Sequence, residues 1–567
     1  MRATLCILLL VVLGAAAQPQ SFRYRSTGGM ILDDIDLWMS SALGMGLMPD
    51  RLLEVEGSRI YTGMSNLMDG QDTALDEDSS DEGGFLIGGS TDLLAPNAAL
   101  GGYGEFYDHR SFEKLEIPGP TGDPLVSGEG MVEGTWSEYT DTNGDGAYDT
   151  RHTVYRAEEG WTDSTITGFT LAGAWTPDNA TQIGLGLGFF KSAVEERPSE
   201  LNYSQTVSDS NLVEGLQTFA LAEESQGAEN RDGSGMGGAL SGSFSLADDL
   251  TGGAMFTFIS HSVSLETDLS ATGSWDSLPS EPEVYDQMTA SRSWSYAADA
   301  SGATFGGGLE LRWMPDSIWR LDVVGGYRTM SIDGTSDDYG LDYDTLYQES
   351  FGSLVETTQI TGLSQGTVEI TDEESRARAG VRISASPTER LDLALGGFFS
   401  MTTTTDEQLI ATSNQSVESY DDGDQEIADP DDYTSTTTWS STERQRTTLE
   451  TTGIHLPSGV EFQVLPRVRA RLGASPGFIW ETEKVSNTLL SASPMQTQVV
   501  YGDGSEQEFT EDPWITSDGT LATTEDSRTE IPFHYGLGFQ AAENLTVDLM
   551  GISDTVDRWR VSATLLF

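Results

Sequence analysis

The sequence predicts an all-β chain that folds as a single antiparallel transmembrane β-barrel. Two observations predict this class: segments of about ten residues with alternating apolar and polar side chains, and short turns that alternate with long polar stretches. This alternation is typical of barrel strands, whose outer face contacts lipid and whose inner face is polar. We expect about 16–18 strands, with about 14 as an alternative, joined by short periplasmic turns and long acidic extracellular loops.

The segment 181–190 illustrates the alternation. Ile183, Leu185 and Leu187 fall on one face, whereas glycines fill most of the other, because side chains of a strand point alternately to its two faces. Pro, Asp and Asn, which favour turns, separate such segments. The predicted short turns are 176–179, 246–249, 314–317, 386–389, 465–466 and 541–544. The predicted long loops are about 196–235, 266–301, 332–374, 404–447 and 485–528.

The composition restricts the partners. The chain has 567 residues and a formal net charge of −62. Such acidity argues against nucleic-acid binding, because contacts to phosphate need Lys and Arg. Two interpretations of the charge stay open: solubility in saline surroundings, or attraction of cations such as Ca²⁺ to acidic loops. We therefore expect no nucleic-acid partner, and the charge names no substrate.

The N-terminus has the features of a secretory signal peptide. Arg2 precedes the apolar run 5–13, and small residues up to Ala17 follow it, which is the order of charged, apolar and cleavage regions. The run is too short to span a bilayer as a helix. We predict a signal peptide over 1–17. The single cysteine, Cys6, lies within it, so we expect no disulfide or thiolate metal site in the mature chain.

The next segment, 18–55, does not alternate cleanly. Its stretch 33–39 fits a short helix better than a strand. We expect 18–55 to be either a periplasmic lead-in or a plug-like segment inside the barrel, and we assign 56–567 to the barrel itself.

The last ten residues alternate and end in an aromatic side chain. Trp559, Val561 and Leu565 share a face with Phe567, whereas Arg558 and Arg560 lie on the other. This segment resembles the C-terminal strand of bacterial outer-membrane β-barrel proteins. The resemblance implies a place in the outer membrane in contact with its lipid, and recognition by the barrel-assembly machinery through Phe567. It also places the short turns in the periplasm. Assembly into a homo-oligomer stays open.

An acidic loop between two predicted strands has the spacing of a calcium site. Alternate oxygen ligands can converge on a hard cation where a glycine, here Gly146, allows a tight bend. The expected ligands are the side chains of Asp141, Asn143, Asp145 and Asp149 and the carbonyl of Ala147. The loop resembles calcium loops of integrin-type propellers but departs from the EF-hand, because His152 stands at position 12. Structural Ca²⁺ and a plain turn are both open.

Charged residues gather on the predicted inner face of the barrel. An Arg on the lipid face would cost about 2–4 kcal/mol at the bilayer midplane, so we expect these side chains to line the lumen. They either form charge rings that bias permeation or form a neutralising network that braces the lumen. The predicted lumen-lining residues are Glu310, Arg312, Arg320, Asp322, Arg328, Arg376, Arg378, Arg382, Asp392, Glu461, Arg467, Arg469, Arg471, Asp548, Arg558 and Arg560.

Catalysis has little support. The histidines are His109, His152, His261, His455 and His534, and none has the spacing of a paired metal motif. The His261-Ser262 dipeptide alone does not make a triad, which is defined by geometry. We expect no enzyme.

The expected function is a porin-like outer-membrane channel for small hydrophilic solutes or ions. One alternative is a non-conducting surface barrel with a structural or adhesive role. A second alternative is a transporter of hydrophobic compounds in which residues 18–55 act as a plug.

Overall fold

The computed structural model describes part of the chain. The described residues are 23, 27, 29–31, 48–55, 57–65, 80–95, 97–113, 115–117, 125–127, 131–140, 150–178, 180–211, 216–277, 284–351, 354–424, 431–512, 520–552 and 555–566. They are almost entirely β-strand, with two short 3₁₀ helices, η1 (Pro49–Glu54) and η2 (Ser199–Leu201). Among them, no helix is both long and apolar enough to cross a bilayer.

Sixteen strands form a closed cycle of antiparallel pairs, in which each strand is hydrogen-bonded to the next and β26 returns to β1. In order around the cycle they are β1 (Arg59–Ser65), β2 (Ser80–Ala95), β3 (Ala98–Phe112), β8 (Trp161–Asp178), β9 (Thr181–Arg197), β11 (Leu216–Ala247), β12 (Leu250–Ser277), β13 (Val284–Trp313), β14 (Trp319–Phe351), β15 (Leu354–Thr388), β16 (Leu391–Asp421), β18 (Ser458–Leu465), β19 (Val468–Ala474), β24 (Phe533–Ala542), β25 (Leu545–Ile552) and β26 (Thr555–Leu566). The alternative of 14 strands is therefore wrong.

The remaining strands extend this ring at one end. They are β6 (Met131–Thr140), β7 (Thr150–Glu159), β10 (Tyr203–Asn211), β17 (Tyr433–His455), β20 (Gly477–Ala492), β21 (Met495–Tyr501), β22 (Glu506–Glu511) and β23 (Thr520–Glu530), with β4 (Leu115–Ile117) and β5 (Leu125–Ser127) as a separate small sheet. Pro457, Pro476 and Pro532 stand where β17, β19 and β23 pass into the next strand. Proline interrupts the ladder at these points because it has no N–H to donate.

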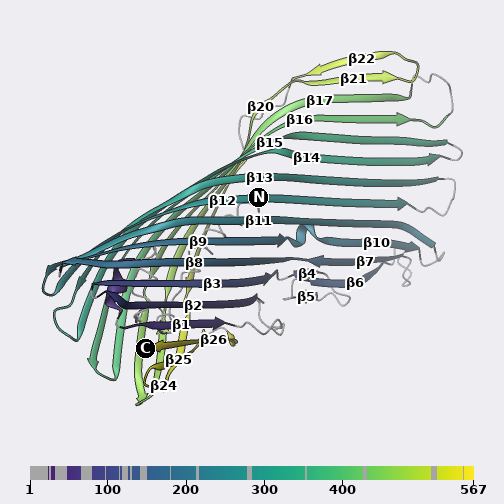
Figure 1. Cartoon of the computed structure of the whole chain (residues 1–567). Helices are drawn as coiled ribbons and strands as arrows, with labels where there is room; N and C mark the ends of the chain where they lie inside the picture. Colours follow the sequence, from purple (N-terminus) through teal and green to yellow (C-terminus); the bar gives the residue numbers. More distant parts are fainter. Residues whose placement is uncertain are drawn as a thin grey trace.

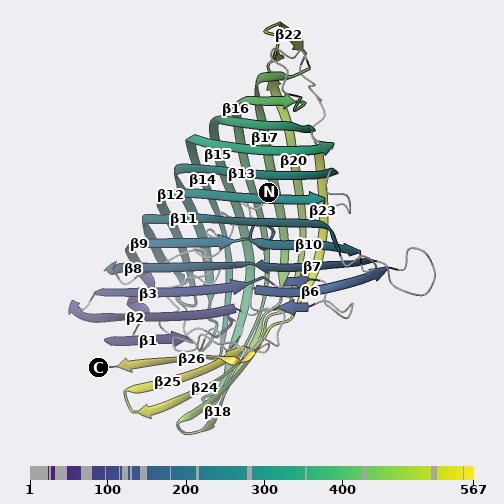
Figure 2. The same cartoon turned by 90° about the vertical axis from the view of Figure 1, so that its right-hand side faces the viewer.

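The strands β11 to β16 run far beyond the ring (Figures 1 and 2). The longest, β15, has 35 residues, which at about 3.3 Å per residue is roughly 115 Å. The hydrocarbon core of a bilayer is only about 30 Å thick. The sheet therefore consists of a closed base near the short turns and a long extension on the opposite side.

The extension corrects one prediction. The polar stretches expected to be long acidic loops are mostly paired strands, as in the ladder that joins β13 to β14 from Val284–Phe351 to Trp313–Leu321. Thr is abundant there and favours strands, and each stretch faces a partner of equal length across its hairpin. A Ser/Thr-rich sequence lacks the alternation of apolar and polar residues by which the strands of the base were predicted. A hydropathy pattern therefore does not detect the strands of the extension.

The short turns separate consecutive strands at all six predicted places. Between β13 and β14, a carboxylate oxygen of Asp316 accepts the N–H groups of Ile318 (2.8 Å) and Trp319 (2.9 Å). Between β8 and β9, the N–H of Ala180 donates to Asp178 (2.8 Å) and holds the pKa of that carboxyl below its ordinary value. These local bonds explain why Asp-rich turns close the hairpins.

The outer surface of the base is apolar, and its inner surface is polar. On β13, Leu309 and Leu311 are 70% and 47% exposed, whereas Glu310 and Arg312 are 7% and 6% exposed. This is the reverse of a protein that faces water on its outside. Other exposed apolar residues of the base include Leu185, Leu187, Leu240, Phe256, Val323, Ile383, Leu395, Leu472, Leu537 and Leu549.

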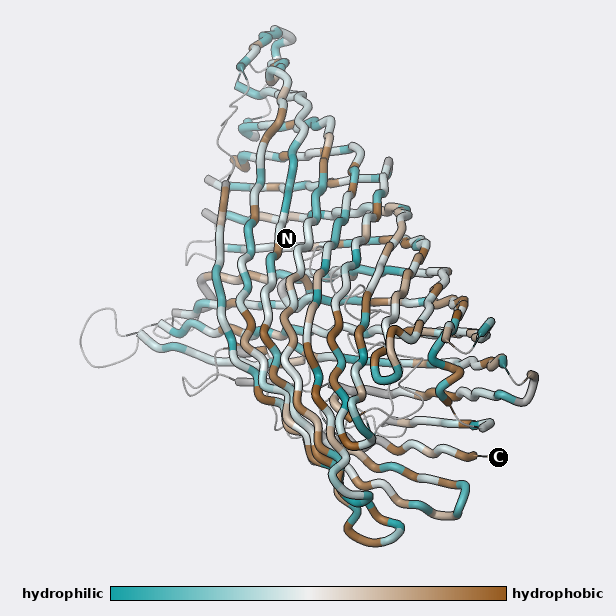
Figure 3. Tube along the Cα trace, turned by 90° about the vertical axis from the view of Figure 1, so that its left-hand side faces the viewer, coloured by the Kyte–Doolittle hydropathy of each residue, from teal (hydrophilic) through white to brown (hydrophobic). Residues whose placement is uncertain are grey.

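These apolar residues form a band near the short turns. Figure 3 shows hydrophobic segments concentrated in the base and mainly polar segments in the extension. On β13 the exposed large apolar residues, from Phe305 to Trp313, lie within the last nine residues, and no described side chain earlier in that strand belongs to this group. About nine to eleven residues of a tilted strand cross a bilayer.

Candidate functional site

The N-terminal segment lies inside the closed base. The helix η1 contacts β3, β8, β9 and β11, and Met30 packs with Val324 and Phe398 on the opposite part of the ring. The ring residues in these contacts alternate with the exposed apolar residues of the outer face. Arg51 and Leu52 are each only 1% exposed. The segment is thus buried against strands on different sides of the ring and lies between them.

Glycines in the wall make room for this segment. A Cβ atom at Gly184 would lie 2.0 Å from the backbone nitrogen of Asp50, and one at Gly459 would lie 2.4 Å from the carbonyl oxygen of Thr27. Contacts this short do not occur between real atoms, so no larger residue fits at either position without displacing the segment. Beside Gly184, Ser241 accepts a hydrogen bond from the Asp50 N–H (3.0 Å) and donates its hydroxyl to the Asp50 carboxylate.

Ion pairs join η1 to β13. Nη2 of Arg51 lies 3.2 Å from Oε2 of Glu310, and Nη1 of Arg312 lies 2.9 Å from Oε2 of Glu54. Arg51 also pairs with Glu54 within the helix. Glu310 and Arg312 of the wall thus each have a partner of opposite sign on the N-terminal segment.

Asp322 is the centre of the network in the wall. It is fully buried and accepts hydrogen bonds from Arg312 (3.3 Å), Arg320 (2.9 Å) and Arg382 (2.7 Å). A buried carboxylate is tolerated only when it is paired and hydrogen-bonded. The three arginines come from β13, β14 and β15, so Asp322 ties together three neighbouring strands.

A second network lies across the ring. Oε2 of Glu461 accepts from Nε of Arg471 (2.6 Å) and from Nε of Arg23 (3.0 Å). Arg23 also reaches Asp392 (3.2 Å), and Arg469 reaches Glu461 (2.8 Å). Nη1 of Arg471 reaches Asp548 (2.6 Å). The N-terminal segment is therefore held by charge at two places on the wall.

The remaining predicted lumen residues have different environments. Arg328 pairs with Glu374 (2.5 Å), and the guanidinium of Arg378 lies 5.3 Å from the ring centre of Phe398. Arg376 is part-buried on the same face of β15. Arg467 is exposed in the turn after Pro466, one residue before β19 begins. The side chains of Arg558 and Arg560 lie outside the described residues.

Sequence reasoning missed the partners on the N-terminal segment. Arg23, Asp50, Arg51 and Glu54 were not assigned to the lumen. The sequence did contain one indication of these contacts. Arginines outnumber acidic residues on the predicted inner wall, and residues 18–55 also carry charges, so pairing between the two could be expected. The sequence does not show which residues meet.

The predicted calcium ligands Asp141, Asn143, Asp145, Ala147 and Asp149 lie outside the described residues. Their flanks are paired, since Thr140 is opposite Thr150 in the β6–β7 hairpin. Elsewhere in the described chain, Asp421, Asp422 and Asp432 gather at the far end of β16. Asp421 accepts the N–H of Gly423 (2.7 Å) and Asp432 that of Asp422 (3.0 Å), so these carboxylates already serve a turn.

His261 is not arranged as a catalytic base beside Ser262. Its Nε2 lies 2.8 Å from Oγ1 of Thr304, and its ring is 5.9 Å from that of Phe190. Ser262 follows directly in the same strand and therefore points to the opposite face.

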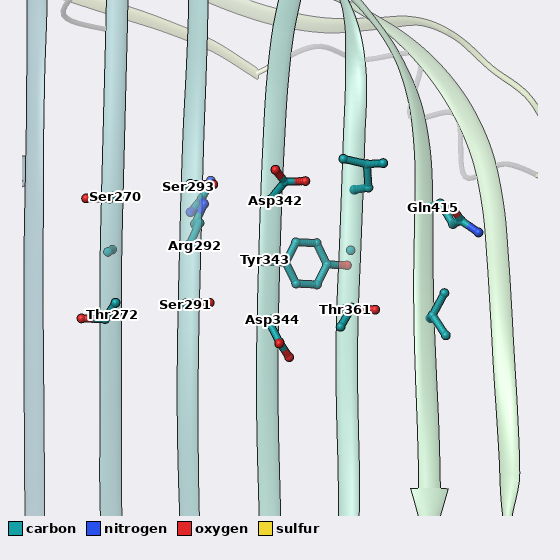
Figure 4. Close-up of a pocket in the computed structure, with 14 residues that line it drawn as sticks. Ser270, Thr272, Ser291, Arg292, Ser293, Asp342, Tyr343, Asp344, Thr361 and Gln415 are labelled. Carbon is teal, nitrogen blue, oxygen red and sulfur yellow. The ribbon is translucent and has the colours of Figure 1, made fainter.

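Two of the hollows in the described part of the chain lie beyond the N-terminal segment. The inner one is a cavity of about 100 Å³ between β9, β11, β12, β13, β14 and β15. The outer one is an open, polar groove of about 460 Å³ on β12 to β16 of the extension (Figure 4). There the ring of Tyr343 lies over Gly362, and its hydroxyl donates to Ser416 (3.3 Å).

The fold and site define a class of protein: a closed antiparallel sheet with an apolar outside, a polar inside and an N-terminal segment in its lumen. No model of a known protein family and no curated protein matches the sequence. Among solved structures, the chain is similar to the Pseudomonas putida toluene transporter TodX, with a TM-score of 0.38 and 10% identity over 97% of this chain and 98% of that chain.

Two other solved structures are similar at the same level. The CymD monoaromatic hydrocarbon channel has a TM-score of 0.32 and 10% identity, with 96% of this chain and 97% of that chain covered. A variant of the ferric enterobactin receptor PfeA from Pseudomonas aeruginosa has a TM-score of 0.27 and 9% identity, with 90% and 80% covered.

Proposed function

We propose that this chain is an outer-membrane β-barrel channel whose lumen is closed by its N-terminal segment and opens when that segment moves. The observation that carries the proposal is the pairing of wall charges with the segment: Arg23 with Glu461, Arg51 with Glu310, and Glu54 with Arg312. A sixteen-stranded ring is wide enough to hold an aqueous channel. The contents of the ring therefore decide whether it conducts.

The apolar band supports the membrane setting. Exposed Leu309 and Leu311 beside buried Glu310 and Arg312 suit a wall with lipid outside and polar groups inside. We place the short turns in the periplasm and the extension outside the cell, as the C-terminal resemblance implies. Assembly through Phe567 and structural Ca²⁺ at 141–149 belong to this proposal.

The lumen favours the plugged transporter over an open porin. An open, ion-selecting pore needs charges that face the permeating ion, whereas four of the described lumen charges, Asp322, Arg382, Glu461 and Arg471, are each paired and at most 4% exposed. The cavity above the segment is lined mainly by apolar side chains. Small apolar or amphiphilic compounds suit this lumen better than ions do.

Conductance in planar bilayers tests the proposal. Wild-type protein should be closed for most of the recording, and the double variant Arg23→Ala/Arg51→Ala should show frequent or steady openings because both anchors are lost. Arg528→Ala is the matched control, since Arg528 pairs with Glu481 (2.6 Å) in an exposed part of the extension. Equal silence of the wild type and the double variant would contradict the proposal.

A second candidate is a non-conducting surface barrel. The observation in its favour is the extension, because a strand of 35 residues reaches far beyond what a membrane requires. This role predicts silence in every plug variant, together with loss of a surface property when the extension is shortened.

A further inference from the structure

The cavity of about 100 Å³ beyond the N-terminal segment is enclosed mostly by apolar side chains. Phe190, Ile259, Val263, Met330 and Ile370 are among the residues that line it. It lies farther from the short turns than η1, because Thr304 of its wall precedes Glu310 by six residues on the same face of β13, roughly 20 Å along the strand. A solute that enters from the extension would meet this cavity before the plug.

Buried polar atoms in the cavity wall that lack a hydrogen-bond partner within the described part of the chain include Oδ2 of Asp372, whose residue is 2% exposed, and Oγ of Ser192, whose residue is 3% exposed. Nε of Arg328 is a third such atom. Ser192 is on β9 and Asp372 on β15, and four strands of the cycle separate them. The curvature of the sheet brings both to one cavity. A buried polar atom without a partner costs about 1–3 kcal/mol, which a ligand that satisfies it would recover.

Several other polar side chains of the wall already make hydrogen bonds. Nη2 of Arg231 donates to Glu229 (3.3 Å), and Nη2 of Arg328 donates to Glu374 (2.5 Å). His261 is hydrogen-bonded to Thr304 (2.8 Å). Oδ2 of Asp372 is therefore a buried oxygen in this wall that can accept a hydrogen bond from a ligand.

The size of the cavity limits the ligand. A cavity of about 150 Å³ holds benzene, and one water takes about 30 Å³. A volume of about 100 Å³ thus suits about three waters or a compound somewhat smaller than benzene. Apolar walls disfavour water and favour a compound with an apolar body.

We infer that this cavity binds a small amphiphile, with an apolar body and one hydrogen-bond donor that Asp372 accepts. The donor is a hydroxyl or an amino group, because both can donate a hydrogen bond to the oxygen of Asp372. The inference deepens the proposed function, because it assigns a solute class to the same lumen. Binding itself does not require conduction.

Fluorine NMR of the full chain in detergent micelles tests the site, with three probes of one shape: trifluoroethanol, trifluoroethylamine and the donor-free trifluoropropane. The wild type should bind an alcohol or amine probe saturably and at least tenfold more tightly than trifluoropropane. Asp372→Asn, which replaces one acceptor oxygen with a donor, should weaken that binding about tenfold. Glu369→Gln, exposed on the outer face of the same strand, is the control and should leave it unchanged.

A second variant, Ser192→Ala, removes another unpartnered group and should weaken both donor probes, because the alcohol oxygen and the nitrogen of the neutral amine can each accept its hydroxyl hydrogen. The tighter of the two donor probes identifies the ligand as an alcohol or an amine. Equal binding of all three probes, binding unchanged by Asp372→Asn, or non-saturable partition into micelles would overturn the inference. If the plug variants show no conductance in planar bilayers but the probes still bind, the proposed channel is wrong and the binding site remains supported.

Discussion

Arg23 and Glu461 are 438 positions apart in the sequence, yet Nε of Arg23 lies 3.0 Å from Oε2 of Glu461. The contact joins the N-terminal segment to the wall at β18, and Arg23 also reaches Asp392 on β16. Arg23 is 20% exposed at its side chain, and Glu461 is 2% exposed. The carboxylate of Glu461 is thus shielded from water, whereas the guanidinium of Arg23 is partly accessible to it. The ion pair can therefore hold the segment and can also be broken.

Asp322 should be the most sensitive charge in the wall. Asp322→Asn leaves Arg312, Arg320 and Arg382 without their shared anion, and removal of one partner of a buried ion pair costs about 3–5 kcal/mol. Urea unfolding in detergent should show a loss of this size. Glu369→Gln, which changes an exposed carboxylate, should stay within about 0.5 kcal/mol of the wild type. Equal stability of both variants would contradict the central role of Asp322.

Gly184 should control the fit of the plug. Gly184→Ala places a methyl group where the backbone of Asp50 lies, so η1 must move, and openings in planar bilayers should become more frequent. Gly325→Ala is the matched control, since a Cβ there meets no atom within 4 Å. If Gly184→Ala conducts no more than Gly325→Ala, the close packing of η1 does not keep the channel shut.

Leu309 tests the lipid contact of the base. Leu309→Arg puts a charge in the apolar band and should cost about 2–4 kcal/mol if the position is near the midplane. Leu363→Arg, on a residue 38% exposed in the extension, should cost far less. Folding into lipid vesicles, followed by the mobility shift of unheated protein in gels, measures both. Similar losses for the two variants would argue against the assigned band.

The loop 141–149 stays a prediction for Ca²⁺. Added Ca²⁺ should raise the Tm of the wild type, and Asp145→Ala should abolish that rise because it removes one expected ligand. Thermal unfolding with Ca²⁺ and after chelation with EGTA provides the measurement. An identical response of wild type and Asp145→Ala would leave the loop as a plain turn.

The base of the fold could be predicted because lipid and lumen impose opposite polarity on adjacent residues. Leu309, Glu310, Leu311 and Arg312 record that alternation in the sequence. The extension could not be predicted in this way, because both of its faces are largely polar and its Ser/Thr-rich strands lack a contrast of hydropathy. Length and pairing, rather than polarity, define those strands.

The plug was predicted only as one of two alternatives, since nothing local distinguishes a lead-in from a segment inside the ring. Its position depends on contacts across hundreds of residues, such as Arg51 with Glu310. In the sequence, Gly184 is compatible with an ordinary strand and equally with a position where the wall must leave room for η1. Arg467 was assigned to the lumen because the alternation with Arg469 and Arg471 was started at residue 467, whereas β19 begins at Val468.

A reversible lock on the plug tests the central claim most directly. The N–H of Asp50 is 3.0 Å from Oγ of Ser241, so Asp50→Cys/Ser241→Cys should form a disulfide between the segment and β11. In the Arg23→Ala/Arg51→Ala background, planar bilayers should be silent when this pair is oxidised and should conduct after a reductant is added. Steady conductance in the oxidised protein, or silence in both states, would contradict a channel closed by its N-terminal segment.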